Sequence, residues 1–166
     1  MSETLVLAIV AAGTGAAAVI DLKTRRVPNA LTMSMAAAGI ALAATGLGPV
    51  GLGASVAGCV LGAALMLPGH VLGATGAGDV KLLAAAGTLL GPGLTFKAFV
   101  ATAIAGGAIA VIVAVQRGRL RQTLTTTTRL ATGQAAATEI EQPTANNRFA
   151  YAPAIAIGVM LAAFVW

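Results

Sequence analysis

Long stretches without charge are the feature that most constrains this chain. Residues 27–78 contain no Asp, Glu, Lys or Arg. A soluble domain could not cover its surface with such a segment, because soluble surfaces carry roughly 25–35% charged side chains. Over the whole chain only 9% of the residues are charged and 58% are hydrophobic. The sequence therefore predicts an integral membrane protein and excludes both a soluble domain and a disordered chain.

Apolar segments along the chain predict about six membrane crossings. A crossing helix needs about 20 mostly apolar residues, with a range near 17–25. Residues 27–78 provide two crossings, separated by the glycines and the proline of residues 45–53. The predicted fold class is all-α, a polytopic membrane helix bundle. Its segments are residues 4–20, the two halves of 27–78, residues 82–96 closed by Gly91-Pro92-Gly93, and residues 98–116 and 149–166.

The basic residues predict the orientation of the bundle. With the N-terminus outside, the inner loops are residues 21–29, 70–81 and 116–148, and they hold every Lys and Arg except Lys97. The positive-inside rule favours this orientation. The first apolar segment lacks a basic n-region, so it is expected to remain as a helix rather than act as a signal peptide. We expect one membrane-embedded domain over residues 1–166, with a cytoplasmic loop at about 116–148 that contacts anionic lipid.

Two aspartates stand out among the few acidic residues. Asp21 follows the first predicted crossing and Asp79 follows the third, so both lie at the same membrane face in either orientation. Ionisable side chains at such positions are costly, and a functional role is the default interpretation. Two carboxyls held close in a low-dielectric site share one proton, as in aspartic proteases. The ionised member can then take a proton from water while the neutral member donates to a peptide carbonyl oxygen.

Charge and spacing alone leave other interpretations open. Asp79 could cap a helix, and Asp21 could pair with Arg25 four residues further on. A proton- or cation-coupled carrier also uses paired intramembrane acids. No metal is expected, because the chain has one His, one Cys and no cluster with ligand spacing. No nucleic-acid partner is expected either, because the basic residues are few and scattered.

Both aspartates lie within recognisable motifs. The segment Gly76-Ala-Gly-Asp79-Val-Lys-Leu82 has the form GxGDxKL. The segment that runs from Asp21 through Arg26, Pro28 and Asn29 to Leu31 has the form D-x4-R-x-PN-x-L. Together these segments resemble the prepilin peptidases, also called type IV leader peptidases, which are GxGD-type membrane aspartic proteases. The late segment Arg148-Phe-Ala-Tyr151-Ala-Pro153-Ala is similar to the start of the last helix in the short, tight-adherence-pilus members.

The resemblance implies a substrate and a pair of catalytic residues. Asp21 and Asp79 would cleave the leader from type IV pilin-like precursors, which present a short basic leader and an apolar helix. Cleavage would occur at the cytoplasmic face of a bacterial inner membrane, with no cofactor. Longer family members carry an N-terminal segment with paired CxxC motifs and N-methylate the product. Because this chain begins at the first helix and has only Cys59, we expect no methyltransferase activity. A small proton-coupled carrier and a non-catalytic pilus or secretion assembly component are the alternatives.

Three residues of the GxGDxKL motif are expected to support the aspartates. Gly76 and Gly78 allow backbone conformations that other residues avoid, and they leave room for a substrate strand. A flexible loop before a helix is the simpler interpretation of the same glycines. Lys81 would tune the acid pair or hold the helix end, and anchoring at the lipid headgroups explains it equally well.

The remaining candidates are interpreted as mainly structural. Arg26 is expected to determine topology rather than bind substrate, because it would repel a basic leader. Pro28 suits the first turn of the second helix, and Asn29 suits a turn or cap. His70 is interpreted as an interfacial residue and Tyr151 as an interface anchor.

Overall fold

The computed structural model of the chain describes residues 2–116 and 151–165. These residues form five helices, which confirms the predicted all-α fold class. The helices are α1 (Ser2–Thr24), α2 (Asn29–Ala44), α3 (Leu52–Val71), α4 (Ala77–Gln116) and α6 (Ala152–Val165). The predicted cytoplasmic loop at about 116–148 and its arginines lie outside the described residues.

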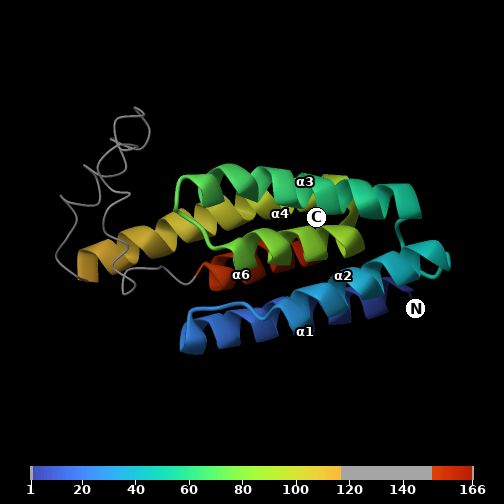
Figure 1. Ribbon diagram of the computed structural model, residues 1–166, viewed down its shortest axis with the longest axis horizontal. Helices are drawn as coiled ribbons and strands as arrows, with labels where there is room; N and C mark the ends of the chain where they lie inside the picture. Colours follow the sequence, from blue (N-terminus) through green and yellow to red (C-terminus); the bar gives the residue numbers. More distant parts are fainter. Residues whose placement is uncertain (1, 117–150, 166) are drawn as a thin grey trace.

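α4 consists of two helical segments that meet at Gly91. This residue has φ 73° and ψ 174°, a conformation that glycine adopts far more easily than residues with a Cβ. Pro92 follows and lacks the amide hydrogen that would continue the helical hydrogen bonding. Figure 1 shows that the chain reverses here, so the second segment (92–116) runs back along the first (77–90). The predicted break at Gly91-Pro92-Gly93 is confirmed, whereas Lys97 lies inside the second segment rather than between two helices.

Among residues 2–116 and 151–165, three helices are long and apolar enough, by length and composition, to cross a membrane: Glu3–Thr24, Leu52–Val71 and Ala77–Ile112, the last of which includes the reversal at Gly91. The apolar helices Asn29–Ala44 and Ala152–Phe164 are shorter. These lengths and compositions are those of an integral membrane protein built from helices. Six crossings and an outside N-terminus stay predictions.

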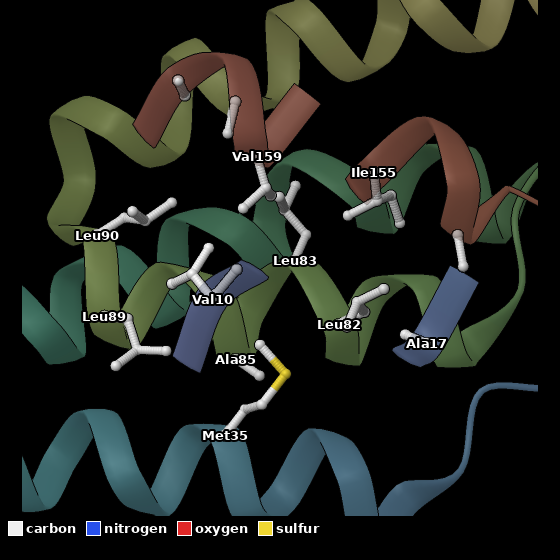
Figure 2. Packing of buried hydrophobic residues seen from close by; sticks show 14 of the residues in the cluster. Val10, Ala17, Met35, Leu82, Leu83, Ala85, Leu89, Leu90, Ile155 and Val159 are labelled. Carbon is white, nitrogen blue, oxygen red and sulfur yellow. The ribbon is translucent and has the colours of Figure 1, made fainter. Parts of the chain in front are cut away.

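The first segment of α4 is the centre of the bundle. Its residues 85–90, together with Gly91, are all buried. In Figure 1 this segment runs between α3 on one side and the α1–α2 pair on the other. Figure 2 shows apolar side chains from α1, α2, α4 and α6 gathered around it. Asp79 lies at the start of this central segment.

α3 packs against the central segment with almost no side chain between the two backbones. A Cβ added at Gly87 would overlap the backbone carbonyl of Gly58, and one added at Gly58 would overlap that of Gly87. The Ser55 hydroxyl donates a 2.8 Å hydrogen bond to the Thr88 carbonyl across the same interface. Small residues allow such close approach between helices in lipid.

Two other interfaces also depend on a glycine. On α6, a Cβ at Gly158 would lie 2.6 Å from the carbonyl oxygen of Ala98 in the second segment of α4. On α1, a Cβ at Gly13 would overlap the side chain of Met35 on α2. The first obstacle is backbone and the second is a flexible thioether, so the two interfaces differ in how far they can adjust.

Candidate functional site

Asp21 is the last member of the buried stripe of α1. The stripe follows the three- and four-residue spacing that keeps side chains on one helix face. Its members are Val6, Val10, Thr14, Ala17 and Asp21. This spacing turns the Asp21 carboxyl into the bundle, where the residue is only 5% exposed.

Asp79 is the first member of the corresponding stripe on α4. Leu83, Ala86 and Leu90 follow it on the same face, and all three are buried. Asp79 itself is 6% exposed. Both aspartates are therefore placed by the register of apolar helices, at the end of one stripe and the beginning of the other.

A neighbouring backbone amide holds the Asp79 carboxylate. The N–H of Gly76 donates to Asp79 Oδ2 at 2.9 Å. Asp79 is the third residue of α4, so its side chain reaches back to the amide that precedes the helix, as in a capping box. A Cβ at Gly76 would lie 3.3 Å from the same Oδ2 atom. The first glycine of the motif thus permits a close approach, and Asp79 fulfils the capping role considered for it.

A distant backbone amide holds the Asp21 carboxylate. The N–H of Ala152, the first residue of α6, donates to Asp21 Oδ2 at 3.2 Å in a buried position. The first amides of a helix have no partner within the helix, and they carry its partial positive charge. The N-terminus of α6 is therefore directed at one of the two acids.

The two aspartates lie within electrostatic range of each other. Asp21 and His70 both lie close enough to Asp79 to interact with it electrostatically. Arg25, which follows α1, lies close enough to Asp21 to interact with it electrostatically. The structure thus brings both acids to one end of the bundle, with Arg25 and His70 near them.

Lys81, predicted as a supporting residue, and Asn29, predicted as a turn or cap residue, bind each other. Lys81 Nζ donates to Asn29 Oδ1 at 3.0 Å and so joins the start of α4 to the start of α2. Pro28 was expected in the first turn of the second helix, but it precedes the helix as the N-cap, with φ −65° and ψ 132°. Asn29 is the first helical residue, so its side chain serves the contact with Lys81 rather than a cap. Arg26 is exposed, and its carbonyl accepts a 3.1 Å hydrogen bond from the Thr24 hydroxyl.

Position 78 requires glycine because there is no room for a Cβ, not because of an unusual backbone conformation. Neither Gly76 nor Gly78 is among the described glycines with positive φ, so the expectation of unusual backbone conformations is wrong here. A Cβ at Gly78 would lie 2.9 Å from the Cβ of Val27. The second glycine of the motif therefore lets the α1–α2 connection lie directly against the start of α4.

Sequence reasoning missed the contact that His70 makes near Asp79. The ring nitrogen Nδ1 of His70 lies 3.1 Å from the carbonyl oxygen of Thr75. Because a carbonyl can only accept, Nδ1 carries the hydrogen. This bond bridges the short connection between α3 and α4 just before Gly76. A lone histidine near a helix end gives no signal of such a bond, because the acceptor is backbone.

The described residues offer no obvious place for a metal ion. Among residues 2–116 and 151–165, no three His, Cys, Asp or Glu side chains come together. The chemistry available at this end of the bundle is that of two buried carboxyls, each bonded to a backbone amide.

The fold and this site define an integral membrane protein of helices with a pair of buried acids at one end. The type IV leader peptidase family matches residues 8–111, which is more than half of the chain. The chain belongs to this peptidase family. The match begins within α1, covers α2, α3 and most of α4, and ends before α6. No curated protein and no solved structure matched the chain.

Proposed function

We propose that the chain is an aspartic endopeptidase that removes the leader from type IV pilin-like precursors. The observation that carries this proposal is the burial of Asp21 and Asp79 at one end of the bundle, within electrostatic range of each other. They are the only two aspartates of the chain. Membership of the leader peptidase family supports the reaction class.

The reaction needs one proton shared between the two carboxyls. The ionised carboxylate takes a proton from a water molecule, and the water oxygen attacks the scissile carbonyl carbon. The protonated carboxyl gives its proton to the carbonyl oxygen at the same time. The C–N bond of the resulting gem-diol intermediate then breaks. The departing nitrogen takes a proton from the pair, and one hydroxyl group of the intermediate returns its proton to the pair as the new carboxyl group forms. One carboxyl and one amine are formed, and the pair again holds a single proton.

The two backbone amides orient the carboxyl groups that act in this mechanism. Each amide binds Oδ2 of one aspartate and so restricts rotation of that carboxyl group. Restricted groups lose less freedom when the reaction geometry is reached, which is how positioning lowers a barrier.

The charge around the site supports a cytoplasmic location at the inner membrane. Lys23, Arg25 and Arg26 follow Asp21, and Lys81 follows Asp79, so four basic residues lie at this end. Basic residues favour the cytoplasmic side. The precursor would present its short basic leader to this side and would place its apolar helix in the lipid bilayer.

Cleavage of a precursor by the purified full chain in lipid nanodiscs tests the proposal. Asp21→Asn and Asp79→Asn should each lower the cleavage rate by about 10²–10⁴-fold, the usual contribution of general acid–base catalysis. Glu3→Gln is the matched control, because it neutralises an exposed carboxyl on the same helix as Asp21. This variant should cleave at the wild-type rate.

Full cleavage by either Asn variant would overturn the mechanism. Proton-coupled transport in proteoliposomes, with the precursor left intact, would favour the carrier alternative instead. Mass spectrometry of the precursor identifies the bond that is cut and so separates leader removal from non-specific proteolysis.

A further inference from the structure

The start of α6 reaches both aspartates. The amide of Ala152 binds Asp21, and the residue immediately before it, Tyr151, lies near Asp79. Burial and the charge of Asp79 together raise the pKa of Tyr151 above its ordinary value. Two consecutive residues therefore interact with two acids from different helices: Ala152 with Asp21 of α1, and Tyr151 with Asp79 of α4.

The position of Tyr151 is set by a glycine on α4. A Cβ at Gly106 would lie 2.8 Å from both Oη and Cε2 of Tyr151, so the ring lies directly on the Gly106 backbone. The ring is half-buried and packs against the hydrophobic core. The next residue of α4 differs completely, because a Cβ at Gly107 would meet nothing within 4 Å.

We propose that Tyr151 is a positioning residue of the active site. With its ring on Gly106, it fixes the N-terminus of α6 so that the Ala152 amide holds the Asp21 carboxylate beside Asp79. This inference rests on the proposed function, since it assigns Asp21 and Asp79 to catalysis. It adds α6, a helix outside the matched residues 8–111, to the parts that make the site.

The ring contact is tested by adding one methyl group at either of two adjacent positions. In Gly106→Ala the new Cβ displaces the Tyr151 ring, and the kcat for precursor cleavage should fall roughly tenfold to a hundredfold. KM should change less than about twofold, because substrate contacts are not the target of the change. Gly107→Ala adds the same methyl group at an exposed position and should leave both constants at wild-type values.

Variants of Tyr151 separate positioning from a general loss of structure. Tyr151→Ala removes the ring from Gly106 and should lower kcat as much as Gly106→Ala. Adding Gly106→Ala to Tyr151→Ala should cost nothing further, because the ring that it displaces is gone. Equal kcat values for Gly106→Ala and Gly107→Ala, or additive losses in the double variant, would overturn the proposal.

A titration tests the placement of Tyr151 without any cleavage. Tyr151 is the only tyrosine of the chain, so a ¹³C label on tyrosine reports this residue alone by NMR. Asp79→Asn removes a negative charge that opposes formation of the phenolate, and Tyr151 should then ionise at a lower pH. Glu3→Gln should not move the titration. An unchanged titration in Asp79→Asn would refute the placement of Tyr151 beside Asp79.

The two proposals fail in different ways. Full cleavage by Asp21→Asn would refute the catalytic assignment, and the inference about α6 that rests on it would fall as well. Loss of cleavage in Asp21→Asn together with normal kcat in Gly106→Ala would refute the role of Tyr151 alone. In that case the peptidase proposal would stand.

Discussion

Asp79 and Asp21 are almost equally buried but are held in different ways. Asp79 accepts its hydrogen bond from Gly76, three residues earlier in the chain, whereas Asp21 accepts from Ala152, which is 131 residues away. The setting of Asp79 is therefore a property of one short loop and the first turn of α4. The setting of Asp21 depends on how α6 packs against the rest of the bundle. Changes in helix packing should act mainly through Asp21, and changes in the loop should act through Asp79.

Gly158→Ala should have the largest effect, because it separates α6 from α4. The added Cβ would lie 2.5 Å from the amide nitrogen of Thr102 and 2.6 Å from the carbonyl oxygen of Ala98, and neither atom can move independently of the helix. We expect a loss of about 1–3 kcal/mol in stability, as is usual for overpacking. Cleavage per folded molecule should also fall at least about tenfold, because the Ala152 amide moves away from Asp21.

Thermal unfolding and kcat are measured together for this variant. Gly107→Ala is the control, because it adds a methyl group to α4 without touching another residue. A Gly158→Ala protein that is destabilised but keeps the wild-type kcat would show that the position of α6 does not govern Asp21.

His70→Ala should have the next largest effect. It tests whether the loop before α4 determines the position of Asp79. It removes the donor to the Thr75 carbonyl in the loop that leads to Asp79. A single hydrogen bond contributes about 0.5–1.5 kcal/mol, so kcat should fall about two- to tenfold. His70→Asn places an amide donor near the position of Nδ1 and should recover most of the rate.

The Ala and Asn variants are equally uncharged, so the difference between their rates isolates the hydrogen bond. Val71→Ala is the neighbouring control, because Val71 is 77% exposed and belongs to the same helix end. Identical rates for His70→Ala and His70→Asn would mean that the loop does not need this bond.

Gly13→Ala should have a smaller effect, although its Cβ also overlaps a neighbour. The obstacle is the side chain of Met35, which has several rotatable bonds and can move aside. We expect a loss of stability below about 1.5 kcal/mol and a kcat within about twofold of wild type. Gly15→Ala on the same helix meets nothing within 4 Å and is the matched control in the unfolding assay. A loss as large as that of Gly158→Ala would show that α1 is held as rigidly as α6.

Breaking the bond between Lys81 and Asn29 should have the smallest effect. Both residues are exposed, and exposed polar pairs contribute at most about 1 kcal/mol. In a double-mutant cycle of Lys81→Met and Asn29→Ala, unfolding should give a coupling energy near 0.5 kcal/mol. Lys23→Met, at the end of α1, should show no coupling to Asn29→Ala. A coupling above about 2 kcal/mol would make this bond a main connection between α2 and α4.

The sequence predicts the features that depend on composition and on rare residues. Isolated charges in an apolar chain are easily seen, so Asp21 and Asp79 stand out, and the glycines beside Pro92 indicate the break in α4. The match to the leader peptidase family confirms the resemblance carried by the two motifs.

The contacts that hold the site are harder to predict. The partners of Asp21 and Asp79 are backbone amides, and every non-proline residue has one, so no side chain indicates them. From the sequence, Tyr151 is interpreted as an interface anchor. The proposed positioning role follows only from the packing of its ring on Gly106, which the sequence does not indicate. Pro28 is the N-cap of α2 rather than a residue of its first turn. Several neighbouring residues together determine where a helix begins, so a sequence pattern places the start only to within one or two residues.

The amide that binds Asp21 belongs to the last described helix in chain order, and this placement bears on biosynthesis. The ribosome makes both acids long before it makes Ala152, and a growing chain folds from its N-terminus onward. Until α6 has been made and packed, Asp21 lacks the donor that orients it. A half-made protein in the membrane therefore holds both acids without the α6 amide that orients Asp21.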